Sequence, residues 1–190
     1  MPILKAYAFP HPPLAVPAVG KGQESGIQKT LAAFDEAAAE IAARAPETVI
    51  FITPHNVLYA DYFHISPGES ATGSLARFGA TDVRLEVEYD TDLIAEITRL
   101  AEDSNIPAGT LGEKEPGLDH GITVPMWFIG QRYQDYKAVI VSDGHRRGLL
   151  LPNLDGIDTV KEQVAIARKK GGIHQSAPVN LERFEVVRHE

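Results

Sequence analysis

The chain of 190 residues contains no cysteine. This absence excludes disulfides, thiolate metal ligands and cysteine nucleophiles, so any bound metal must be held by histidine and carboxylate side chains. The sequence also lacks a run of about 20 apolar residues, the length needed to span a bilayer, and its N-terminus has no basic region followed by an apolar core. We therefore expect a cytoplasmic protein that does not bind membranes.

Positive charge is scarce as well. Lysine and arginine number 18 against 26 acidic residues, which gives a formal net charge of -8, and the longest basic cluster is Arg168 to Lys170. Such a balance opposes binding to nucleic acid. The sequence has no G-x-S-x-G turn and no phosphate-binding loop, which excludes the common serine hydrolases and nucleotide-binding proteins. With 44% hydrophobic residues it has the composition of an ordinary globular domain.

The first half of the chain predicts alternating strands and helices. A near-continuous apolar run over residues 3–9 predicts a buried strand, which the prolines at 10, 12 and 13 end. Apolar residues at steps of three and four over 25–44 predict a helix, and 48–53 predicts a second strand. This order suggests a βαβ unit with a right-handed crossover.

Further along, the patterns predict a strand pair at 59–66 and 82–89, a helix at 92–103, a helix from 118 that Pro125 either kinks or starts, and a strand at 136–141. Beyond Ser142 we expect a short strand at 149–151, a helix carrying Val160, Val164 and Ala167 on one face, and a last strand at 183–190. The fold class is therefore α/β, a mixed or mainly parallel central sheet flanked by helices with a short C-terminal strand-helix-strand segment.

Two histidines follow predicted strands, each next to proline: His11 and His55. The carboxyl ends of strands are where ligands bind in open α/β sheets. Neutral imidazoles suit Fe, Zn, Cu or Ni, and two histidines with one carboxylate are typical of non-haem Fe(II) sites. The alternative is that both rings only hydrogen-bond to the backbone.

A third histidine, His120, precedes Gly121 at the expected start of a helix, where it suits a proton donor or acceptor. Asp119 either orients its ring or caps the helix. We expect His64 to be a packed or surface residue of a strand. We expect His145, His174 and His189 to be solvated.

The sequences FPHPP, ITPHN and LDHGITVPMWFI, in that order, resemble the LigB-type class III extradiol dioxygenase superfamily, which also contains the MEMO proteins. The resemblance covers residues 1–142. It implies that His11 and His55 bind Fe(II), that His120 is the catalytic acid/base, and that the substrate is a small catechol-type aromatic whose ring is cleaved. Zn, Cu or no metal remain alternatives.

The resemblance breaks near Ser142. Family members supply a third metal ligand, usually Glu, from a later segment that this chain does not have. Residues 143–190 instead resemble the closing segment of the AMMECR-type domain, found in AmmeMemoRadiSam system protein A. Asp143, His145, Glu113, Glu115 or a carboxylate of a second subunit could complete the site, but none matches the family motif.

Two functions are compatible with these features. One is extradiol ring cleavage. The other is a non-catalytic metal-binding or protein-interaction module of the MEMO and AMMECR type. Because a shortened sheet exposes strand edges and apolar faces, we also expect a homo-oligomer.

Overall fold

A computed structural model of the chain describes residues 3–56, 59, 61–112, 117–142, 159–170, 173–175, 179 and 181. The chain divides into two compact units, Met1–Gly144 and His145–Glu190. Within the described residues of the second unit there is one helix, α5 (Val160–Lys170), where a helix was predicted. The predicted strands at 149–151 and 183–190 lie outside the described residues.

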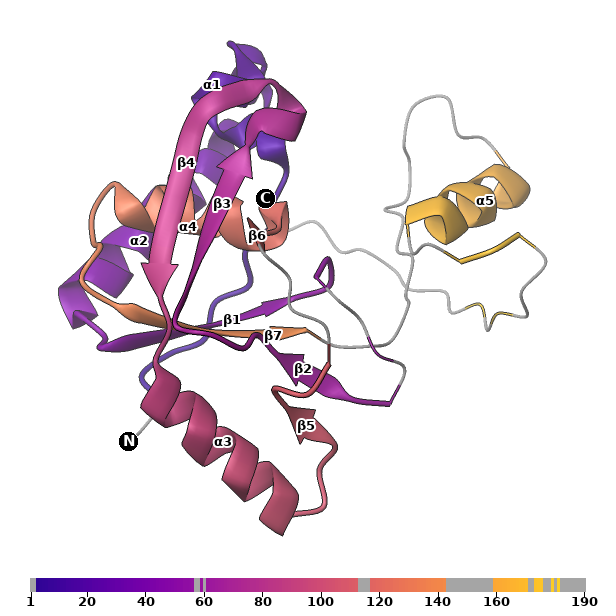
Figure 1. Cartoon of the computed structure of the whole chain (residues 1–190). Coiled ribbons are helices and arrows are strands. Elements are labelled where there is room, and N and C mark those ends of the chain that lie inside the picture. Colours follow the sequence, from indigo (N-terminus) through magenta and orange to yellow (C-terminus); the bar gives the residue numbers. More distant parts are fainter. Residues whose placement is uncertain are drawn as a thin grey trace. The chain divides into compact units, whose positions relative to one another are not determined.

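The first unit holds the remaining helices and strands (Figure 1). In chain order these are η1 (Pro13–Ala15), α1 (Pro17–Gly20), η2 (Gln23–Ile27), α2 (Gln28–Arg44), β1 (Thr48–Thr53), β2 (Phe63–Ile65), β3 (Ser70–Leu75), η3 (Ala76–Phe78), β4 (Ala80–Glu88), α3 (Thr91–Asp103), β5 (Ala108–Gly109), β6 (Gly117–Leu118), α4 (His120–Gly130) and β7 (Lys137–Ser142).

The strands form two sheets. One has the order β1-β7-β2-β5, in which β1 and β7 are parallel, β7 and β2 antiparallel, and β2 and β5 parallel. The other has the order β4-β3-β6, with β3 antiparallel to β4 and parallel to β6. A parallel bridge between Tyr89 and Ala138 links the end of the β4 segment to β7. The predicted mixed α/β fold is confirmed.

The core lies where β7, α4 and α2 meet. Val139 and Ile140 of β7 and Ile122 of α4 are fully buried, and Ile41 of α2 packs in the same cluster. Figure 1 shows α2 and α4 beside each other on one side of the β1–β7 pair. Burial of each large aliphatic side chain stabilises the fold by about 1.5–3 kcal/mol. These helices are thereby fixed against the strands whose ends carry the site.

The predicted helix at 25–44 is confirmed as α2, although its regular part begins at Gln28 after the 3-10 turn η2. Its buried residues, Phe34, Ala38 and Ile41, are spaced by four and three as the periodicity predicted. The helix ends at Arg44 and is capped by Ala45, which has a left-handed backbone (φ 43°) and whose N–H bonds back to the Ile41 and Ala42 carbonyls.

Aspartates cap the two helices that follow strands. Asp90 accepts a hydrogen bond from the Leu93 N–H at the start of α3 and another from the Thr48 hydroxyl of β1. Asp119 caps α4 by accepting from the Gly121 N–H. Each cap satisfies a backbone donor that the helix itself leaves unbonded. Pro125 lies inside α4 and does not start it, so its place in the first turn is ruled out.

The predicted strand at 3–9 is wrong, because residues 3–12 belong to no helix or strand. Ile3 and Leu4 are exposed, by 87% and 52%, so the apolar run is not buried on both faces. Phe9 instead stacks on Phe34 of α2, and Lys5 pairs with Glu40 of the same helix. The segment is partly buried by packing on α2. The predicted first βαβ unit is therefore also wrong, because it required a strand at 3–9.

The predicted pairing of 59–66 with 82–89 is also wrong, although both segments contain strands. β4 pairs with β3, and β2 lies in the other sheet. The strand that was overlooked, Ser70–Leu75, has the sequence SATGSL, whose small and polar residues have little strand propensity. Its alternate residues are nevertheless buried, so packing determines that it is a strand.

Among the described residues, none of the helices combines the length and the apolar character that crossing a bilayer requires.

Candidate metal centre

Three histidines from distant parts of the sequence meet in the first unit. They are His11, before η1, His55, two residues after β1, and His120, the first residue of α4. One nitrogen of each ring lies within 4.8 Å of the others. The structure therefore brings together the same residues that the sequence singled out.

His11 and His55 face each other directly. Their Nε2 atoms are 2.8 Å apart, and the two rings are nearly perpendicular. On the opposite side of the His11 ring, Nδ1 is 3.4 Å from the Phe9 carbonyl, which can only accept. If Nδ1 carries the proton that this contact requires, the lone pair of His11 is on Nε2 and points at His55.

His55 is positioned by the end of β1. Its backbone N–H donates to the Thr53 hydroxyl at 3.3 Å, and that hydroxyl donates to the Asp119 carboxylate at 2.9 Å. Asp119 immediately precedes His120, and the rings of His55 and His120 stack at 4.3 Å between centroids. A short polar connection thus runs from the strand to the helix behind the two rings.

His120 is partly buried, and its Nδ1 is buried without a hydrogen bond within the described part of the chain. Burial lowers the pKa of His120 to about 4, and the charges of His55, His11 and Arg77 act in the same direction. The ring is consequently neutral at pH 7 and can accept a proton or a cation.

Phe78 forms an apolar wall beside the histidines. Its ring lies 5.3 Å from that of His120, centroid to centroid. The Arg77 guanidinium lies over the Phe78 ring at 4.8 Å, which is within the range of a cation–π contact. An aromatic molecule that reached His120 would therefore meet an aromatic side chain and a positive charge.

The three side chains fit a metal ion. Two nitrogen ligands at adjacent octahedral positions, each about 2.1 Å from the metal, lie about 3 Å apart, and the 2.8 Å between His11 and His55 is close to this spacing. His120, whose buried Nδ1 has no hydrogen bond within the described residues, belongs to the same cluster. An all-imidazole set suits Fe(II), Zn, Cu or Ni.

The candidates for a third ligand, Glu113, Glu115, Asp143 and His145, all lie outside the described residues, as does His189. His64 is a fully buried residue of β2, so of the two expected placements, packed or on the surface of a strand, it has the first. His174 is exposed, as expected. Neither belongs to the cluster.

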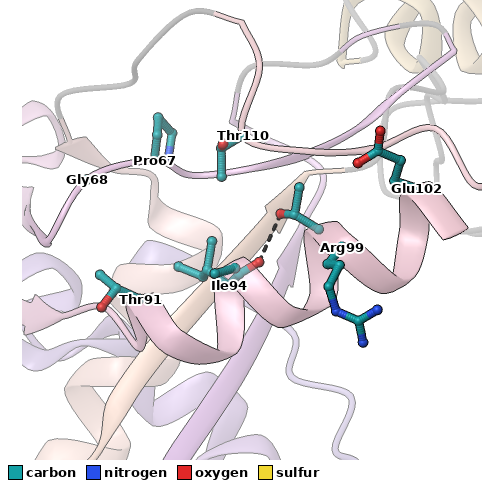
Figure 2. Close-up of a pocket in the computed structure, with 9 residues that line it drawn as sticks. Pro67, Gly68, Thr91, Ile94, Arg99, Glu102 and Thr110 are labelled. Atoms are coloured by element: carbon teal, nitrogen blue, oxygen red, sulfur yellow. Dashed lines mark hydrogen bonds between the residues drawn. The ribbon is translucent and has the colours of Figure 1, made fainter.

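A separate pocket of about 460 Å³ lies over α3 and contains none of these histidines (Figure 2). Pro67, Gly68 and Thr110 face the helix across it, and the Arg99 guanidinium points away from them. Arg99 is engaged with Glu96 and Asp103 on the surface of α3. Because the charge of Arg99 is used in these surface ion pairs, we assign the pocket no chemistry.

Sequence reasoning missed Thr53, Arg77 and Phe78. Thr53 lies in ITPHN beside a singled-out histidine, but a threonine in a strand is unremarkable by itself. Arg77 and Phe78 are far from the histidine motifs in sequence and join them only through the fold of β3 and η3. No spacing rule would have found these two.

The low pKa of His120 gives a pH prediction. In metal-free protein the His120 ring should titrate near pH 4 instead of the usual value of about 6.5, because the charged form is poorly solvated. Between these two values the unfolded state binds more protons, so stability should fall as pH falls from about 6.5 to about 4. Ring carbon and nitrogen NMR shifts of labelled protein, followed from pH 8 to pH 3.5, measure the midpoint.

The control for this titration is Arg77→Gln, which removes the smallest of the contributing charges and should move the midpoint slightly upward. A midpoint at or above 6.5 in the parent protein would show that His120 is solvated in solution and would contradict the geometry described.

The chain is similar to known proteins over the region that contains the three histidines. The family model of the catalytic LigB subunit of aromatic ring-opening dioxygenase matches residues 5–147. Protein CA_C1420 of Clostridium acetobutylicum is 36% identical over 143 residues, which cover 72% of this chain and 31% of that protein. A protein of Thermotoga maritima is 51% identical over 126 residues, which cover 64% of this chain and 71% of that protein.

The chain thus spans about a third of the Clostridium relative. The family match, by contrast, extends over most of the present chain and contains His11, His55 and His120. On this match, the chain belongs to the LigB family and has an extradiol-dioxygenase-like fold.

Proposed function

We propose that this protein is a non-haem Fe(II) protein that cleaves the ring of a small catechol-type aromatic. The observation that carries the proposal is the 2.8 Å approach of His11 Nε2 to His55 Nε2, with His120 stacked against His55. This arrangement occurs in a chain of a family described by aromatic ring opening.

In this proposal His11 and His55 hold the metal, and Zn or Cu are the alternative ions. Fe(II) would supply Lewis acidity and open coordination positions for the reactants. The Phe9 carbonyl fixes the His11 ring through Nδ1, and the end of β1 fixes the backbone of His55. Both rings are therefore oriented before a cation arrives.

His120 would serve as the acid/base. Because its pKa is well below 7, the ring is neutral and can take a proton from a substrate hydroxyl, then return it to an oxygen of the product. Phe78, which lies beside His120, would pack on the aromatic ring of the substrate and exclude water from that side of the substrate. The histidine is thus placed between the metal ligands and the apolar wall.

The metal site predicts the effect of removing either ligand. Protein purified without oxygen should contain iron near one equivalent, whereas His11→Ala and His55→Ala should each lose it, because one imidazole cannot hold the ion alone. Elemental analysis of anaerobically purified samples, followed by Fe(II) titration, measures the stoichiometry.

His174→Ala is the matched control, since it removes an exposed histidine of the second unit and should leave the iron content unchanged. A parent protein that neither retains nor binds Fe(II) would eliminate the proposed function.

The proposed acid/base role of His120 predicts a loss of turnover without a loss of iron when this residue is replaced. His120→Gln should keep the iron but reduce turnover of catechols by about 10²- to 10⁴-fold, because the amide cannot accept a proton. Oxygen consumption and the absorbance of the ring-opened product measure turnover. Loss of iron in this variant would instead make His120 a third metal ligand, which its position within 4.8 Å of the other two nitrogens also permits.

A non-catalytic metal-binding or interaction module is the second candidate. It is favoured by the ligand set, because the cluster within the described residues contains three histidines and no carboxylate. The proposed likeness of residues 143–190 to the AMMECR-type domain belongs to this reading as well. Bound metal without oxygen consumption on any of a panel of catechols would decide for it.

We also propose that the protein is a cytoplasmic homo-oligomer. β1 is an edge of its sheet, and Ile50 and Ile52 on it are 47% and 75% exposed. An exposed apolar edge strand favours pairing with another chain. Light scattering at micromolar concentration should give at least a dimer, and Ile52→Lys should shift it toward monomer. A parent protein that is monomeric would refute the proposal.

A further inference from the structure

We infer that Thr53 is a positioning residue that holds His55 and His120 in their stacked arrangement through the Asp119 carboxylate. The inference rests on the proposed function only where it concerns metal affinity. The arrangement of the two rings is a property of the metal-free protein and can be tested without any metal.

Thr53 lies at the last position of β1 and is 1% exposed. Its hydroxyl hydrogen is directed to the Asp119 carboxylate, 2.9 Å from Oδ2 and 3.1 Å from Oδ1, and its oxygen accepts from the His55 N–H. A hydroxyl has one hydrogen to donate and lone pairs to accept with, so one side chain uses both capacities. It joins the backbone of one histidine to the residue before the other.

Asp119 is held from the helix side too. Its carboxylate accepts from the Gly121 N–H as the cap of α4, which fixes the first turn that carries His120. The carboxylate therefore receives a hydrogen bond from the strand and another from the helix. Bonds to an ionised carboxylate are stronger than those between neutral groups, and they weaken steeply when their geometry is lost.

Gly121 allows this close approach. A Cβ on Gly121 would lie 2.8 Å from Asp119 Oδ1, 2.8 Å from Thr53 Oγ1 and 3.2 Å from His55 Cδ2. Any larger residue would have to separate the hydroxyl, the carboxylate and the His55 ring from one another. The strand end and the helix start can meet at this distance because position 121 carries no side chain.

Loss of the Thr53 hydroxyl would change how the His55 and His120 rings are positioned relative to each other. Without the Thr53 hydroxyl, the His55 backbone loses an acceptor and the Asp119 carboxylate loses a donor, so the loop after β1 is free to move relative to α4. The stacking of His55 on His120 at 4.3 Å would then lose the hydrogen-bonded connection between strand end and helix start that holds the two residues together. His55 would also be less well oriented toward His11.

The test compares Thr53→Val, which removes the hydroxyl at nearly constant shape, with Thr53→Ser, which keeps it. In metal-free protein, nuclear Overhauser contacts between the His55 and His120 ring protons should be present in the parent and in Thr53→Ser, and lost in Thr53→Val. Binding of Co(II), read from its visible spectrum, should weaken about tenfold in Thr53→Val, the low end for loss of a group that orients a ligand. Thr53→Ser should remain near the parent.

Thr123→Val is the matched control. Thr123 is also a buried threonine, and its hydroxyl donates to the backbone carbonyl of Asp119 at 2.8 Å and not to the carboxylate. The variant should lose comparable thermal stability but keep the ring contacts and the Co(II) affinity. Equal losses in Thr53→Val and Thr123→Val would reduce Thr53 to a general structural role and overturn the inference.

Gly121→Ala tests the same connection if Thr53→Val fails to fold. Alanine favours a helix over glycine, so α4 itself is not weakened, while the new methyl must separate Thr53 from Asp119. We expect the same loss of ring contacts. If the parent binds no Co(II) but these contacts behave as expected, the proposed function fails and the positioning role stands; unchanged contacts in both variants would refute that role.

Discussion

Six residue pairs join β1 to β7 in parallel, from Thr48 with Lys137 to Thr53 with Ser142. Parallel neighbours cannot be joined by a tight turn, so the chain between them must leave the sheet and return. It does so through the β3–β4 hairpin, α3 and finally α4, which runs directly into β7. Because α2 precedes β1 and α4 precedes β7, the two helices pack beside each other, and the carboxyl end of β1 comes to lie at the start of α4. The meeting of His55 with His120 follows from this one pairing.

Much of this arrangement could be predicted from the sequence wherever a segment carried one clear helix or strand pattern. Thr48–Thr53 was predicted with its bounds because β-branched residues fill it and a proline follows it. α2 was predicted because its apolar period is regular. The failures have a shared cause. Residues 3–9 look like a buried strand, and SATGSL at 70–75 does not look like a strand at all, but in both cases the outcome depends on which neighbour offers burial or backbone partners. That information lies in distant residues.

The site shows the same division. His11, His55 and His120 could be found because each stands beside prolines or a glycine in a recognisable motif, and the structure does place their rings together. The residues that orient or enclose these histidines cannot be identified from their residue type or spacing in the sequence. Phe78 reaches His120 only because η3 turns back after β3, and the Thr53 hydroxyl meets the Asp119 carboxylate only because the fold brings in a residue 66 positions later in the chain. A motif can indicate which atoms would do chemistry, but the second layer of contacts is determined by the tertiary fold.

The electrostatics of the cluster connect folding with the proposed chemistry. Protonation of His120 is disfavoured by burial of its ring, and the charges of His55, His11 and Arg77 act in the same direction. The folded state therefore keeps the His120 ring neutral, and neutral nitrogen is also the form that binds a metal ion. Protons and a divalent cation thus compete for the same lone pairs. Within the described residues, the neutral His120 ring lies in the cluster with His11 and His55, and its buried Nδ1 has no hydrogen bond.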